Sequence, residues 1–159
     1  MSEVNYAKAN EVFNTLCSTL DSINFKYDAK PEDLLIVSGM SGDDFPMNFL
    51  IKINAGAQVI SFISPLPFKI SEEKRVELAV AICAVNNILL DGSFDYDIDD
   101  GSISFRLTSS YRESTIGNDL FTYMIAVSTK TIDDFNDKFF MVDKNMMTLE
   151  QFLESLKKN

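Results

Sequence analysis

The sequence contains no histidine and no tryptophan, and its 159 residues include only two cysteines, four prolines and six glycines. Histidine is the commonest general base and the commonest nitrogen ligand of metals, and Ser-His and Cys-His relays require it. Most hydrolase mechanisms are therefore excluded, and we expect no catalytic, metal-binding or cofactor-binding residues. Any catalysis would have to use carboxylates, lysine, tyrosine, cysteine or hydroxyl groups.

Basic residues are also scarce, because 14 Lys and Arg stand against 24 Asp and Glu, which leaves a formal net charge of −10. The arginines are Arg75, Arg106 and Arg112. Nucleic-acid binding draws most of its affinity from clustered Lys and Arg, and a negative field repels phosphate. We therefore expect neither a nucleic acid nor an anionic membrane surface as a partner.

No apolar run has the roughly twenty residues that a membrane-spanning helix needs. The longest mostly apolar stretch, Val76 to Leu90, is interrupted by Glu77, Asn86 and Asn87. The opening residues MSEVNYAKAN lack the basic start and apolar core of a signal peptide, so we expect a cytoplasmic location. Cys17 and Cys83 lie far apart within helical patterns, and we interpret them as free buried thiols, with a disulfide as the alternative.

The composition, 46% apolar and 24% charged, is that of an ordinary globular protein. No repeat or Pro/Gly/Ser-rich linker divides the sequence, so we predict a single domain over residues 1–159. Hydrophobic periodicity and turn residues predict a helix over Val4–Ile23, strands over Phe25–Asp28, Leu34–Met40, Met47–Asn54 and Gln58–Ser64, a helix over Ser71–Leu90, a hairpin over Phe94–Leu107, a helix over Ser114–Met141 and a last short helix after Thr148. The predicted fold class is α+β, an antiparallel sheet flanked by helices in the order α-β-β-β-β-α-β-β-α-α.

The two predicted hairpins have specific registers. Asp100-Gly101 suits a two-residue turn, in which both central residues need positive φ. This register pairs Ile98 with Ile103, Tyr96 with Phe105, Phe94 with Leu107 and Asp95 with Arg106. The earlier hairpin, closed at Asn54 to Ala57, brings Phe49 near Phe62 and Ile51 near Ile60, although a loop one residue longer would shift the pairing.

Two helix starts carry capping signals. Ser71, followed by Glu72 and Glu73, is expected to cap the helix after it. Thr148 and Gln151 match a capping box, and Met147 and Phe152 are placed for a hydrophobic staple.

Three patterns resemble catalytic or metal sites, but none has all the features that such a site requires. Asp95, Asp97 and Asp99 are spaced like a calcium loop, but its required glycine comes one residue late and Arg106 occupies the position of the bidentate Glu. Ser41 lacks the second glycine of a nucleophile elbow and any histidine to activate it. The adjacent acid pairs Asp43/Asp44, Glu72/Glu73 and Asp133/Asp134 suit a turn, a helix start and a solvated helix face.

The helix over Ser71–Leu90 has two apolar faces. One carries Val76, Val80, Cys83 and Asn87, and we expect Val80 to be internal. The nearly opposite face carries Leu78, Ile82, Val85 and Leu89, which we predict to bind a partner. The alternative is that the long helix over Ser114–Met141 covers this second face within one monomer.

The helix that ends in Asn86-Asn87 and the Asp-Gly hairpin after it, within ELAVAICAVNNILLDGSFDYDIDDGSISFRL, resemble the YbjN family of proposed bacterial sensory-transduction regulators. The likeness extends from about Asn10 to Phe139, and the family's fold is similar to that of type III secretion chaperones. The resemblance implies a non-enzymatic domain, often a homodimer, whose chaperone relatives hold an extended segment of another protein. It assigns no residue a role.

The first functional hypothesis is therefore a protein-binding or regulatory module, with a protein partner of unknown identity. The alternatives are a small-ligand-binding protein, a carboxylate-based enzyme, or a structural component of a larger assembly. A deep cleft with convergent polar groups would favour the ligand-binding and enzymatic alternatives.

Overall fold

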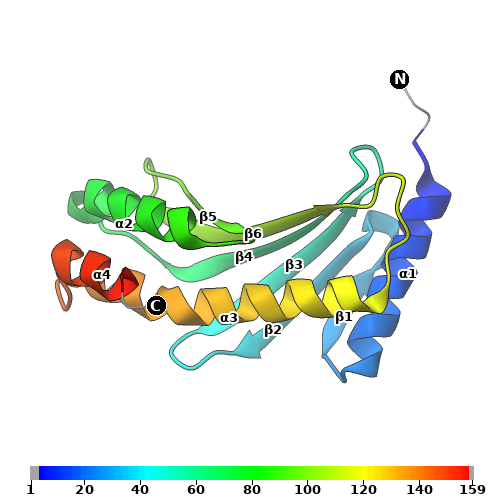
Figure 1. Ribbon diagram of the computed structural model, residues 1–159. Coiled ribbons are helices and arrows are strands. Elements are labelled where there is room, and N and C mark those ends of the chain that lie inside the picture. The colour runs from blue at the N-terminus through cyan, green and yellow to red at the C-terminus, as the bar shows by residue number, and fades with distance from the viewer. Residues whose placement is uncertain (1–3, 158–159) are drawn as a thin grey trace.

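The computed structural model describes residues 4–157, which form one six-stranded antiparallel sheet and four α-helices (Figure 1). Met1 to Glu3, part of the opening stretch considered above for a signal peptide, lie outside this range. The elements are α1 (Tyr6–Ser22), β1 (Tyr27–Lys30), β2 (Leu35–Ser41), β3 (Pro46–Asn54), β4 (Val59–Lys69), α2 (Arg75–Ile88), β5 (Ser93–Tyr96), β6 (Ser102–Ser110), α3 (Asn118–Asp143) and α4 (Leu149–Leu156). The predicted fold class and element order are confirmed.

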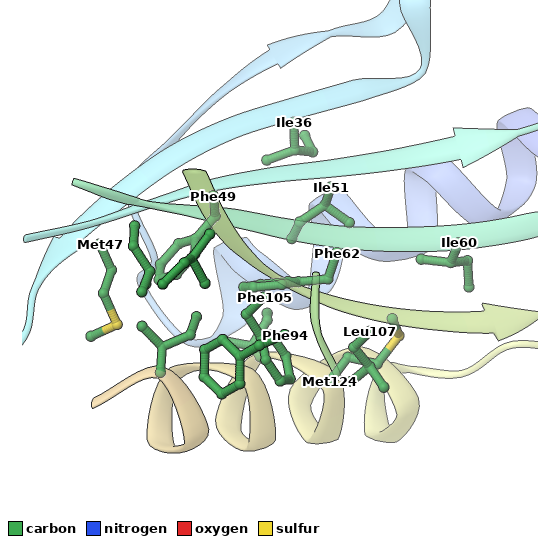
Figure 2. Close-up of a cluster of buried hydrophobic side chains, with 14 of the residues drawn as sticks. Ile36, Met47, Phe49, Ile51, Ile60, Phe62, Phe94, Phe105, Leu107 and Met124 are labelled. Carbon is green, nitrogen blue, oxygen red and sulfur yellow. The ribbon is translucent and has the colours of Figure 1, made fainter. Parts of the chain in front are cut away.

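The strands lie in the order β1-β2-β3-β4-β6-β5, and every neighbouring pair is antiparallel. Strand β3 buries alternate residues from Met47 to Ile53, while Leu50 and Lys52 between them are exposed. This period of two is that of a sheet with one face on the core. Figure 2 shows Phe49, Phe62, Phe94 and Phe105 gathered on this buried face above α3, which contributes Met124.

Helix α1 follows its predicted pattern. The side chain of Asn5 caps its start by accepting a hydrogen bond from the backbone N–H of Lys8 at 2.9 Å. Val12, Leu16 and Leu20 are buried on one apolar stripe, whereas Ile23, the last residue of the predicted helix, follows the observed end at Ser22 and is 42% exposed. Cys17 behind this stripe is half-buried and free.

Both hairpins form with registers two residues away from the predicted ones. Ile51 pairs with Phe62 in the first hairpin, and Tyr96 pairs with Ile103 in the second. The physical reason is loop length: residues 55–58 and 98–101 make four-residue loops, the second closed by hydrogen bonds between Asp97 and Ser102 and from Gly101 to Asp97. A shift of two residues keeps each side chain on its predicted face. Arg106 now lies opposite Ser93 instead of Asp95, but its side chain still forms an ion pair with Asp95 at 2.6 Å.

Strand β4 was predicted to end at Ser64 but continues through Pro65 and Pro67 to Lys69. Its pairing with β3 stops at Ile63, and its register with β6 shifts between Pro65 and Lys69. The prolines therefore occupy a stretch with one partner strand and a bulge, where a missing backbone N–H is tolerated.

The helix expected from Ser71 is divided into a 3-10 turn, Glu72–Lys74, and α2. The Ser71 side chain does not cap it. The hydroxyl instead donates to Asp143 at the end of α3. The helix predicted over Ser114–Met141 is one continuous helix, α3, which begins at Asn118 and ends at Asp143. The capping box of α4 is confirmed, since the Thr148 hydroxyl accepts from Gln151 N–H and the Gln151 side chain accepts from Thr148 N–H.

Candidate protein-binding surface

Three of the four residues predicted to bind a partner lie on the inner side of α2, and the fourth, Leu89, directly follows its last residue. Leu78 and Val85 are 0% exposed, Ile82 is buried, and Leu89 is half-buried against the same core. Helix α2 packs on β5, α3 and α4, which cover this face within the chain. The structure thus matches the alternative reading, in which the monomer itself covers Leu78, Ile82, Val85 and Leu89.

The opposite face of α2, which we call its outer face, is exposed to solvent. Val76 is 71% exposed and Val80 is 47% exposed, and Cys83 and Asn87 are exposed beside them. The expectations that Val80 and Cys83 are internal were wrong. Helical periodicity separates the two faces of α2, but which face meets the core depends on α3, α4 and β5, which are distant in sequence.

Asn86 fixes the end of α2 against the sheet. Its side-chain amide donates to the backbone carbonyl of Phe94 at 3.0 Å and accepts from the N–H of Phe94 at 2.8 Å. These two hydrogen bonds use both polar atoms of the Asn86 side chain, while the neighbouring Asn87 is exposed. The outer face of α2 is thereby held in a fixed orientation.

Helix α4 lies beside α2 at the end of the molecule away from α1 (Figure 1). Phe152 anchors it: this side chain is 0% exposed, and its ring stacks on Phe139 of α3 with centroids 5.8 Å apart. Leu149, Leu153 and Leu156 remain half-buried on α4. An aromatic anchor and a capped first turn therefore hold an apolar face of α4 next to the C-terminal part of α2.

The two helices enclose an open groove of about 810 Å³. Ala84, Asn87 and Ile88 line it from α2. From α4 the lining residues are Leu149, Leu153 and Leu156, together with Glu150, Glu154 and Lys157. We call this the α2–α4 groove. Its lining is mostly aliphatic, which is typical of sites that accept apolar side chains.

A second cavity of about 610 Å³ adjoins the groove and shares Ile88 and Leu156 with it. Lys130, Asp134 and Lys138 of α3 also line this cavity. Lys130 pairs with Asp134 at 2.7 Å, and the Lys138 ammonium donates to the backbone carbonyl of Asp134 and lies over the Phe135 ring. Both lysines at this end are thus already in contact with polar or aromatic groups of α3 itself.

The residues that resembled chemical motifs take structural positions. Asp95 pairs with Arg106, and Asp97 accepts from the N–H of Asp99 in the hairpin loop. Ser41 is exposed at the end of β2. Among residues 4–157, no group of three or more His, Cys, Asp or Glu side chains is arranged to hold a metal ion.

Among residues 4–157, the carboxyl groups with displaced pKa values are those of Asp100 and Asp143, and neither lines the α2–α4 groove. The pKa of Asp100 is lowered well below its usual range by hydrogen bonds from Lys69 and Ser102. Burial raises the pKa of Asp143, but bonds from Lys144 and Ser71 outweigh this effect and lower it. Both shifts favour the charged form, as in structural ion pairs.

Within the described residues, no helix combines the length and the apolar character needed to cross a membrane.

No protein-family model and no curated protein sequence matches the chain. Solved structures do match in fold. YbjN of E. coli, a proposed transcription regulator, superimposes with a TM-score of 0.56 and 14% identity over 77% of this chain and 86% of YbjN. A chain of the HopA1-SchA chaperone-effector complex superimposes with a TM-score of 0.58 and 9% identity over 85% of this chain and 99% of that chain. The fold shared with YbjN and with this chaperone-effector complex confirms the architecture expected from the resemblance.

Proposed function

We propose that this chain is a non-enzymatic protein-binding module, of a regulatory or chaperone-like kind, that binds its partner through the outer face of α2 and the α2–α4 groove. One observation carries the proposal: the exposed residues Val76 and Val80 continue along α2 into the apolar groove at Ala84 and Ile88. Contiguous exposed apolar surface on a water-facing domain typically marks an interaction site.

The outer face of α2 also has the spacing of a helix–helix interface. Val76, Val80, Cys83 and Asn87 follow one another at intervals of four, three and four residues, which is the seam spacing of a coiled coil. An Asn in such a seam specifies register at a cost in stability. A protein surface with a matching helix, from a second copy or another protein, therefore suits this face.

The fold likeness supports the proposal without specifying the partner. One of the similar structures is a chaperone-effector complex and the other a proposed regulator. A protein partner is consistent with both.

The small-ligand and enzymatic alternatives have less support among residues 4–157. The α2–α4 groove is open to solvent, and the two carboxyl groups with displaced pKa values lie outside it and are held as anions. An enzyme built on carboxylates needs such groups to converge in the pocket.

Native mass spectrometry of the protein purified gently from its own cells tests the proposal, with Val80→Asp as the disrupting variant. Ile98→Asp is a matched control, because Ile98 is 48% exposed against 47% for Val80 but lies in the β5–β6 loop. We expect the wild type and Ile98→Asp to retain a second polypeptide or a second copy and Val80→Asp to lose it, with equal circular dichroism spectra. A bare wild-type monomer, or retention in Val80→Asp, contradicts the proposal.

A further inference from the structure

The walls of the α2–α4 groove restrict the backbone conformation of what binds there. Both walls are α-helices, whose unpaired backbone N–H and C=O groups lie in the first and last turns and point along the helix axes instead of across the groove. An extended segment lying in the groove would find few backbone partners, whereas a helix satisfies its own backbone groups. The groove therefore favours a helical occupant over a strand.

The length of the groove fits a short helix. Helix α4 has 8 residues, which corresponds to roughly 12 Å at 1.5 Å per residue. Over that distance a bound helix presents anchors at positions i, i+3 or i+4, and i+7. Ala84 and Ile88 on one wall and Leu149 and Leu153 on the other offer apolar contacts to such anchors.

The charge of the groove selects among amphipathic helices. Glu150 and Glu154 both line it; Glu154 pairs with Lys157 at 2.6 Å, whereas Glu150 makes no ion pair with any residue between 4 and 157. The whole chain has a formal charge of −10, so its long-range field attracts cations. At the far end, Lys130 and Lys138 are engaged by Asp134 and Phe135.

We propose that the α2–α4 groove binds a basic amphipathic helix of a partner protein, with apolar anchors between α2 and α4 and a Lys or Arg beside Glu150. This inference rests on the proposed function and specifies its partner. The basic side chain lies at the end of the groove formed by the first turn of α4, where Glu150 is located.

Two labelled helical peptides of about 15 residues provide the probes. Both have leucines at positions i, i+3 and i+7; one carries lysines at the flanking positions and the other glutamates. Fluorescence anisotropy with the full chain is measured at physiological ionic strength and at higher salt. We expect the lysine peptide to bind at least about tenfold more tightly than the glutamate peptide, and its affinity to fall with salt.

Protein variants distinguish binding in the groove from attraction by the overall negative charge of the chain. Ile88→Asp removes apolar contact at a residue that is already 48% exposed, and Ile98→Asp is its control. Glu150→Lys reverses the local charge, and Glu32→Lys at the remote turn Pro31–Asp33 makes the same change in net charge. We expect Ile88→Asp and Glu150→Lys each to weaken lysine-peptide binding at least about fivefold, and both controls to change it less than about twofold.

The outcomes distinguish this inference from the proposed function. Equal weakening by Glu150→Lys and Glu32→Lys, or equal binding of the two peptides, overturns the basic-helix inference. So does binding that is insensitive to Ile88→Asp. The proposed function is judged separately by the assembly of Val80→Asp, so it stands if that variant loses its partner while the lysine peptide fails to bind.

Discussion

The carboxylate of Asp143, the last residue of α3, accepts two hydrogen bonds from Ser71, one from its backbone N–H at 2.8 Å and one from its hydroxyl at 2.7 Å. Lys144 lies 2.7 Å from the other carboxylate oxygen. Because Ser71 directly precedes the turn that leads into α2, these bonds fix the start of α2 to the end of α3. The position of the proposed binding surface depends on this link.

Replacing this carboxylate is expected to destabilise the fold. Asp143 is buried, and Asp143→Ala leaves the Ser71 donors without their acceptor, so we expect the free energy of unfolding to fall by about 1–3 kcal/mol at pH 7. Urea denaturation measures the change. Asp134→Ala is the control, because its pair with Lys130 is exposed and should cost at most about 1 kcal/mol. Equal losses in the two variants would contradict the role of Asp143.

The same residue predicts a pH dependence. Because the folded pKa of Asp143 lies below its ordinary value of 3.8, its contribution to stability is complete above that pH and is lost as the pH falls through the folded pKa. The difference in unfolding free energy between wild type and Asp143→Ala should therefore be constant from pH 7 to about pH 5 and shrink in more acidic solution. Urea titrations at stepped pH measure it, and a difference that grows on acidification would be inconsistent with this sign.

The two faces of α2 should respond differently to truncation. Leu78→Ala opens a cavity in the core and is expected to cost about 2–5 kcal/mol of unfolding free energy. Val80→Ala, on the outer face, should change it by less than about 0.5 kcal/mol. Guanidinium denaturation of both variants measures the two changes in unfolding free energy. If Val80→Ala proved the more damaging, α2 would be rotated relative to the structure.

Helix α2 also shows why the site was less predictable than the fold. Its periodicity correctly predicts two apolar faces, one with Leu78 and one with Val80. The face with Leu78 is aliphatic, and the face with Val80 carries Val76 beside Cys83 and Asn87, so each could be covered by another apolar surface and the local pattern does not tell which one meets α3 and β5. That choice depends on contacts between residues far apart in the chain, which a local pattern does not contain.

The hairpins and α4 show the same difference between features that neighbouring residues determine and features that depend on residues further away. The alternation of apolar and polar residues determines which strand side chains face the core, and this prediction holds in both hairpins. Loop length sets the register, and the Asp100-Gly101 pair alone did not predict that its loop has four residues. In α4, by contrast, the capping box lies entirely within Thr148 to Gln151, so neighbouring residues suffice to predict it.

The hydroxyl of Tyr27 donates to the Asp21 carboxylate at 2.9 Å and so joins β1 to the end of α1. Burial and this bond raise the pKa of Tyr27 to about 12. A raised folded pKa contributes stability that is complete below the ordinary value of 10 and is lost as the pH rises towards 12. We therefore expect the stability of wild type relative to Tyr27→Phe to decrease across this interval.

Ultraviolet absorbance of tyrosinate checks the assignment directly. The difference between the titration curves of wild type and Tyr27→Phe isolates this one residue from Tyr96, Tyr111 and Tyr123, whose pKa values are also raised. Asp21→Asn should lower the Tyr27 midpoint, because it removes the charge that opposes phenolate formation. An unchanged midpoint would assign the shift to burial alone.

The capped start of α4 should control the proposed binding groove. Thr148→Ala removes the acceptor of the Gln151 N–H bond and is expected to destabilise α4 by about 1 kcal/mol, while Thr148→Ser keeps a hydroxyl there. Hydrogen exchange should accelerate severalfold in the amides of Leu149 to Leu156 in the alanine variant and much less in α1. Because Phe152 still anchors the helix on Phe139, we expect loosening rather than loss of α4. Binding of the lysine peptide should weaken together with this protection, since an ordered α4 supplies one wall of the groove; faster exchange with unchanged affinity would place the peptide on α2 alone.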